Sequence, residues 1–94
     1  MIMCEHAHPH EQTQQVLNRI SRAAGHLAAV GRMIEEGRDC SDVLIQLAAV
    51  RSAVNNVGKL IINDHLSHCI AAAVEQGDRT SLERFTAALD TFLK

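Results

Sequence analysis

The chain has 94 residues, enough for one folded domain, with 47% hydrophobic but only 2% aromatic residues. Its core must therefore be built from Ala, Val, Leu and Ile, which suit closely packed helices. The net charge of −2 argues against a general polyanion binder, and no apolar stretch is long enough to span a membrane. We predict an all-α, cytoplasmic protein that assembles with copies of itself, because a lone domain of this size buries a modest share of its surface.

The first ten residues are the one segment of biased composition. They hold a cysteine and three histidines, namely Cys4, His6, His8 and His10. Short His/Cys tracts are compatible with metal binding but cannot form a core. A tail without fixed structure and a segment that becomes ordered on binding metal both stay open. We predict a flexible tail over residues 1–10 and a single helical domain over residues 11–94.

The first helix is predicted to begin near Pro9 and to run to about Glu36. Proline is tolerated in the first turn of a helix, and apolar residues then recur at helical spacing. Gly37 is a suitable residue to end this helix.

The second helix is predicted to begin near Ser41, as N-cap, and to continue to Gly77. Apolar residues follow one another at steps of three and four, and no proline interrupts them. Gly58 costs about 1 kcal/mol within a helix and need not break it. A helix of about 35 residues is long for a small domain and requires a partner helix along its length.

The third helix is predicted to begin near Thr80, which forms a capping box with Glu83. One apolar stripe follows, made of Leu82, Phe85, Leu89 and Phe92. The sequence thus predicts a three-helix protomer with a long central helix.

The second helix carries residues whose side chains bind metals. His65 and Cys69 are four residues apart, so their Cβ atoms lie about 5–6 Å apart on one helix face and the pair can share a metal ion. This pair alone is weak evidence, since a buried cysteine beside a surface histidine is common. Cys40 strengthens it, because the 25 residues to His65 return to within about 20° of the same helix direction.

Cys40 and His65 cannot meet within one straight helix, because they are separated by roughly 37 Å along its axis. They can meet if two copies of the second helix pack antiparallel. Twofold symmetry then creates two identical sites, each with Cys40 of one chain and His65 and Cys69 of the other. We therefore predict an antiparallel dimer with intersubunit metal sites.

Two thiolates and one imidazole form a soft ligand set, which favours Cu(I) and also suits Zn(II) or Ni(II). A four-coordinate metal needs one further donor, which the histidine-rich tail could supply. Redox sensing is the alternative, through an intersubunit disulfide between Cys40 and Cys69. Nothing in the sequence resembles a catalytic triad, a phosphate loop or an acid–base pair, so we do not expect an enzyme.

The basic residues of the first two helices include Arg19, Arg22 and Arg51. On these residues alone an ordinary solvated surface is favoured, and no known DNA-binding motif is evident.

The stretch QLAAVRSAVNNVGKLIINDHLSHC (46–69) resembles the CsoR/RcnR/FrmR family of metal- and aldehyde-responsive repressors. The segment RISRAAGHL (19–27) is similar to another family stretch, with His26 where glutamine is usual. The resemblance covers the chain from about Gln14 to Lys94. It implies an antiparallel dimer, a dimer of dimers, and repression of a metal-efflux operon whose operator DNA is released on binding metal.

By position, the resemblance implies DNA contacts by Arg19, Arg22 and Arg51. The set Cys40, His65 and Cys69 matches the copper-sensing members, although Asp39 stands where these often carry a tyrosine.

The spacing from His8 to Cys40 resembles that of the fourth ligand in nickel-sensing relatives of the InrS type. We expect a Cu(I)-responsive repressor, with Ni(II) as the alternative metal. A metal-binding or storage module without DNA contact, and a thiol redox or sulfide sensor, stay open.

Overall fold

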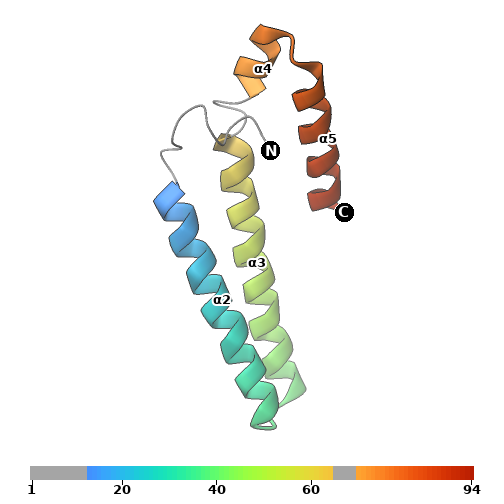
Figure 1. Ribbon diagram of the computed structural model, residues 1–94. Helices are drawn as coiled ribbons and strands as arrows, with labels where there is room; N and C mark the ends of the chain where they lie inside the picture. Colours follow the sequence, from blue (N-terminus) through green and yellow to red (C-terminus); the bar gives the residue numbers. More distant parts are fainter. Residues whose placement is uncertain (1–12, 65–69) are drawn as a thin grey trace. The chain divides into compact units, whose positions relative to one another are not determined.

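The computed structural model describes residues 13–64 and 70–94, and these residues are helical with no strand (Figure 1). The described residues form four helices in chain order: α2 (Thr13–Glu35), α3 (Cys40–Asp64), α4 (Ala71–Gln76) and α5 (Arg79–Leu93). The all-α prediction is confirmed. None of the described helices is both long and apolar enough to cross a membrane.

The chain divides into two compact units. The first is Thr13–Lys59, a hairpin in which α2 runs antiparallel to most of α3 (Figure 1). The described part of the second is residues 60–64 and 70–94, which contain the end of α3 together with α4 and α5.

Helix α2 ends at the predicted glycine. Gly37 has a φ of +74°, in the left-handed region that favours glycine. The Gly37 N–H donates to the Ile34 carbonyl at 3.1 Å, and the Arg38 N–H donates to the Met33 carbonyl at 3.0 Å. These two bonds form a Schellman motif, which satisfies carbonyls at the end of the helix and turns the chain into α3.

Helix α3 is capped by Asp39, so the predicted N-cap at Ser41 is wrong. The Asp39 carboxylate accepts a hydrogen bond from the Ser41 N–H at 3.0 Å, and its carbonyl accepts one from the Val43 N–H at 3.1 Å. A carboxylate at this position also interacts favourably with the positive end of the helix dipole. Cys40 is therefore the first residue of the helix.

The hairpin core is a seam of small aliphatic residues. The buried residues are Ala23 and Val30 on α2, with Val50 and Val57 on α3. In each helix they are seven residues apart, the repeat by which two helices bury a continuous stripe. The hairpin positions three residues after a buried residue are half-buried, so a second set belongs to the seam: His26 and Met33 on α2, and Ala53 on α3.

One polar pair crosses this seam. His26 Nε2 lies 2.8 Å from Gln46 Oε1, and the hydrogen bond between them is partly buried. Because Gln46 Oε1 can only accept, His26 Nε2 is the donor. The bond fixes which residues of α2 and α3 lie at the same level along the hairpin.

Two described elements, α3 and α4, lie within the predicted second helix. Helix α3 ends at Asp64 and α4 begins at Ala71, while residues 65–69 lie outside the described residues. Ile70, which precedes α4, has helical backbone angles (φ −71°, ψ −41°). The continuity of the predicted helix across residues 65–69 therefore stays a prediction.

The predicted stop at Gly77 is confirmed, with a φ of +68°. The Gly77 N–H donates to the Val74 carbonyl at 3.2 Å, and the Asp78 N–H donates to the Ala73 carbonyl at 2.8 Å. This second Schellman motif ends α4, which packs against α5.

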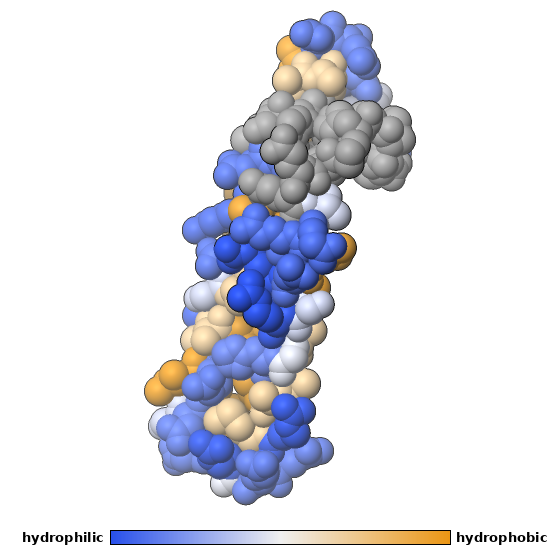
Figure 2. Space-filling view, turned by 90° about the vertical axis from the view of Figure 1, so that its left-hand side faces the viewer, coloured by the Kyte–Doolittle hydropathy of each residue, from blue (hydrophilic) through white to orange (hydrophobic). Residues whose placement is uncertain are grey.

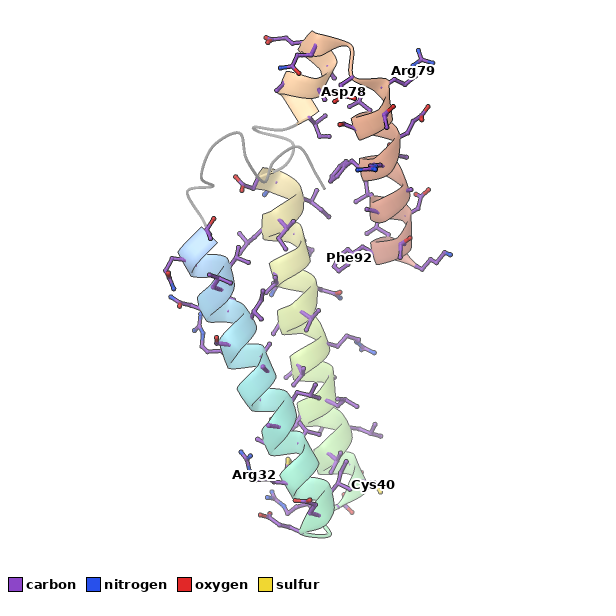
Figure 3. All side chains as sticks on the ribbon, in the orientation of Figure 1. Arg32, Cys40, Asp78, Arg79 and Phe92 are labelled. Atoms are coloured by element: carbon purple, nitrogen blue, oxygen red, sulfur yellow. The ribbon has the colours of Figure 1, made fainter. Side chains whose placement is uncertain are left out.

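Helix α5 is capped by Asp78 rather than by the predicted box of Thr80 and Glu83. Asp78 Oδ1 accepts from the Ser81 N–H at 3.1 Å, and Oδ2 accepts from the Ser81 hydroxyl at 2.7 Å. A carboxylate has two acceptor oxygens, so it can satisfy the helix end and the hydroxyl together. The helix consequently starts at Arg79, just after the cap (Figure 3).

Acid is expected to weaken this cap. The hydrogen bonds from the Ser81 hydroxyl and N–H have the largest effects and lower the pKa of Asp78; burial opposes them, and the charge of Arg84 adds the smallest effect, which also lowers the pKa. A carboxyl group whose pKa is lowered in the folded state stabilises that state above its ordinary pKa of 3.8. The stabilisation is lost as the pH falls below 3.8 and through the lowered pKa.

The variant Asp78→Asn should therefore unfold at a lower temperature than the parent at neutral pH, with the difference shrinking in acid. Thermal unfolding followed by circular dichroism at several pH values measures this difference. Asp90→Asn on the same helix is the control, expected to match the parent at neutral pH. A difference for Asp78→Asn that is constant with pH would contradict the assignment.

Candidate metal site and DNA interface

Cys40 stands at the turn end of the hairpin, where its thiol is free and exposed (Figure 3). The Schellman motif at Gly37 and the Asp39 cap fix the backbone directly before it. Among the described residues no group of three or more His, Cys, Asp or Glu side chains is placed to hold a metal ion. A metal site at Cys40 therefore needs donors from outside the described part of one protomer.

Helix α3 exposes a row of large apolar side chains. The exposed fractions are 64% for Leu44, 41% for Leu47, 47% for Val54 and 41% for Ile61. In a helix these positions lie on one side, about a quarter turn beyond the seam. Cys40 begins the same row, and Arg51 lies within it between Leu47 and Val54. Cys40 is thus at one end of an uncovered apolar surface.

Helix α2 exposes a matching row, made of Leu17, Ile20, Leu27 and Ile34. Leu27 and Ile34 directly follow the seam residues His26 and Met33, as Val54 in the α3 row follows Ala53. Because the two helices are antiparallel, the same offset brings both rows to one face of the hairpin. Figure 2 looks onto the hairpin from the side of α2 and shows hydrophobic residues reaching the edges of a largely hydrophilic surface.

Three of the four predicted metal ligands fall outside the described residues. These are His8, His65 and Cys69. Their grouping with Cys40 stays a prediction from the sequence.

The three predicted DNA-contacting arginines all lie on the hairpin. Arg22 and Arg51 are exposed, and Arg19 is half-buried in the seam. The Nε of Arg19 is buried and has no hydrogen-bond partner among the described residues.

The hydrogen bond between His26 and Gln46 is a reference point from which the position of each arginine along the hairpin axis can be measured. From that bond toward the open end of the hairpin, Arg22 is about 6 Å away, Arg51 about 7.5 Å and Arg19 about 10.5 Å, at 1.5 Å per residue. The structure thus brings the three to a common level. It does not bring them to one face of the protomer, because Arg51 lies in the exposed row whereas Arg22 precedes the seam residue Ala23.

The contact between His26 and Gln46 and the two exposed rows were not predicted from the sequence. The seven-residue repeat of the seam, with a large apolar residue directly after many of its members, was the available signal for the rows. No signal paired His26 with Gln46, because that contact depends on the register between two helices.

Comparisons with known proteins agree with this geometry. The family model described as metal-sensitive transcriptional repressor matches residues 12–91. The copper-sensing transcriptional repressor CsoR of Bacillus subtilis is 34% identical over 84 residues, which cover 89% of this chain and 81% of that protein.

Two solved structures are similar as well. The nickel-responsive transcriptional regulator InrS is 43% identical with a TM-score of 0.73, over 93% of this chain and 99% of InrS. The copper-sensing repressor CsoR with Cu(I) from Geobacillus thermodenitrificans is 29% identical with a TM-score of 0.84, over 100% of this chain and 95% of that one.

The family match covers the hairpin and nearly all of the remaining helices, and it confirms the resemblance drawn from residues 19–27 and 46–69. The solved relatives share the helical fold over almost their whole length. This chain belongs to the family of metal-sensitive transcriptional repressors.

Proposed function

We propose that the protein binds operator DNA without metal and releases it when Cu(I) binds between two subunits, which derepresses metal efflux. Membership of a repressor family implies DNA binding and assembly of several copies. The observation that carries the finer proposal is the position of Cys40, an exposed thiol at one end of the uncovered apolar row of α3.

The apolar row favours a second copy as its partner. A continuous apolar surface of this kind marks an interaction site, and the two rows on one face allow the hairpins of two copies to pack as a four-helix bundle. The row extends about 32 Å along α3, from Cys40 to Ile61. If the two copies of α3 are antiparallel, Cys40 of one lies beside the far end of the other, where His65 and Cys69 follow in the sequence.

This arrangement would give two metal sites per dimer, each with Cys40 from one subunit and His65 and Cys69 from the other. A set of two thiolates and one imidazole suits Cu(I), which needs no fourth ligand. Relatives described as copper-sensing support this metal. A dimer of such dimers is the assembly that the family resemblance implies.

Ni(II) is the second candidate, with His8 as an additional ligand. It is favoured by the similarity to the nickel-responsive regulator InrS, which is 43% identical to this chain. Ni(II) in a tetragonal geometry needs a donor beyond the three shared with Cu(I), and the tail could provide it.

DNA binding is assigned to Arg19, Arg22 and Arg51. All three lie at one level of the hairpin, and an assembly of several copies can gather them into one surface even though they occupy different faces of a protomer. Phosphate contacts by these arginines would make binding strongly dependent on salt.

The switch is a shift between two arrangements of the assembly. Metal bridging two chains favours one arrangement and DNA favours another, so each ligand weakens the binding of the other.

The test is an anaerobic titration with Cu(I) and, separately, with Ni(II), each followed by DNA binding. The operator duplex is obtained by selecting the tightest-binding sequences from a random pool with the metal-free protein. Cu(I) is expected to release the duplex at about one ion per subunit, and the variant His65→Ala should not respond. If His65→Ala still responds, a thiol redox sensor is favoured. If Cu(I) fails while Ni(II) releases DNA through His8, the metal is Ni(II).

A further inference from the structure

We propose that the operator lies along the acid-free part of the hairpin and that Lys59 is a further residue that contacts a DNA phosphate. This inference rests on the proposed DNA-binding function and extends it to a residue and a boundary that the family resemblance did not supply.

The hairpin is polarised in charge along its length. Its acidic residues all lie in one short stretch at the turn: Glu35, Glu36, Asp39 and Asp42. Neither residues 13–34 of α2 nor residues 43–63 of α3 contain an acidic residue. Two arginines, Arg32 and Arg38, share the turn with these four carboxylates, so the turn carries a net charge of two negative units (two positive against four negative).

Beyond the turn the formal charges of the hairpin are all positive. They belong to Arg19, Arg22, Arg51 and Lys59. At physiological ionic strength the field of an exposed charge extends about 8 Å, so these cations are screened from the carboxylates of the turn. Arg51, for example, is about 13 Å along α3 from Asp42. DNA is therefore attracted to the acid-free part of the hairpin and repelled from the turn that carries Cys40.

Lys59 extends the surface of Arg51 along the outer side of α3. Both side chains are exposed. Lys59 follows Arg51 by eight residues, which places it about 12 Å further along the helix and about 80° around it. The next acidic residue, Asp64, is turned about 140° away from Lys59 around the same helix.

Two cations separated by about 12 Å along the helix axis, and by more than that between their charged groups, suit an extended polyanion rather than a compact anion. Duplex DNA carries a negative charge about every 1.7 Å of its axis, so a strand that meets Arg51 can present another phosphate to Lys59. The chain's other lysine, Lys94, follows α5 at the C-terminus of the chain and provides a matched control.

The experiment compares the metal-free parent with Lys59→Ala, Lys59→Arg, Lys94→Ala and Arg32→Ala. Fluorescence anisotropy gives the affinity for the selected operator duplex at several salt concentrations. Lys59→Ala should weaken binding and reduce the slope of log affinity against log salt by about 0.9 for each copy of Lys59 that contacts a phosphate. Lys59→Arg should retain the parent slope, as should Lys94→Ala and Arg32→Ala.

Arg51→Ala separates the two proposals. If Arg51→Ala loses operator binding while Lys59→Ala keeps the parent slope, the assignment of Lys59 is wrong and the proposed function stands. If Arg32→Ala reduces the slope as much as Lys59→Ala, the DNA also contacts the acidic turn, and the proposal that the operator is confined to the acid-free part of the hairpin is wrong. If the parent selects no duplex at all, the proposed function itself fails.

Discussion

The variant Cys40→Ala is expected to keep its operator bound when Cu(I) is added. Removing a group that only supports a metal ligand already costs about 10–100-fold in metal affinity, so loss of the thiolate itself should cost more than about a hundredfold. Operator binding without metal should be unchanged, because Cys40 stands at the acidic turn, away from Arg19 and Arg51. Ser41→Ala, which alters the next residue of α3, is the control and should still release DNA.

The same variant tests whether the site is shared between subunits. In a dimer of Cys40→Ala with His65→Ala, one site lacks both residues and the other is intact. After subunit exchange about half of the dimers contain one chain of each variant, and each of these has one intact site of two, so mixing the two inactive variants should restore roughly a quarter of the Cu(I) binding, with DNA release returning alongside. A site built within one chain gives no restoration, and that result would overturn the intersubunit geometry.

Replacing Leu47 by aspartate is expected to prevent the dimer from forming. Leu47 is central in the exposed row of α3, and it is already 41% exposed in the protomer, so the hairpin tolerates a polar group there. In the dimer the new carboxylate would be buried in an apolar interface, where a pair with Arg51 one turn further along the row offsets only part of a desolvation cost of several kcal/mol per ion. Since each 1.4 kcal/mol is tenfold in a dissociation constant, dimer dissociation should become more than about a thousandfold easier.

The measurement is molar mass in solution by sedimentation or light scattering, with helix content followed by circular dichroism. Ser52→Asp introduces the same charge at an exposed position of α3 outside the row and should leave the assembly intact. A Leu47→Asp protein with parental helix content and parental molar mass would show that the row is not the interface. Loss of metal and operator binding together should accompany dissociation.

The helical hairpin could be predicted because its determinants are local. Apolar spacing identified both helices, and glycines with positive φ end α2 and α4 at Gly37 and Gly77 as expected. The caps could not be assigned in the same way. At the starts of α3 and α5 an aspartate precedes the predicted serine or threonine by two residues. Which of the two side chains caps the helix depends on the backbone angles at that point, and a sequence pattern locates a helix end only to within a residue or two.

Part of the candidate site could also be predicted. The helical direction of Cys40 follows from residue spacing, and the structure places Cys40 in an exposed row as an antiparallel dimer would require. The sequence did not predict that Arg19, Arg22 and Arg51 lie at similar positions along the hairpin axis, because these positions depend on how α2 is aligned with α3. That alignment is visible only in the contact of His26 with Gln46.

The hydrogen bond between His26 and Gln46 limits how the hairpin can move. It lies about 9 Å along α3 from Cys40 and about 7.5 Å, in the other direction, from Arg51. Any displacement that keeps this bond must carry both helices as one rod, since neither can slide past the other. Metal binding at the Cys40 thiol would then affect the arginines by rotation of whole hairpins against neighbouring subunits. The contacts that change would be those between chains.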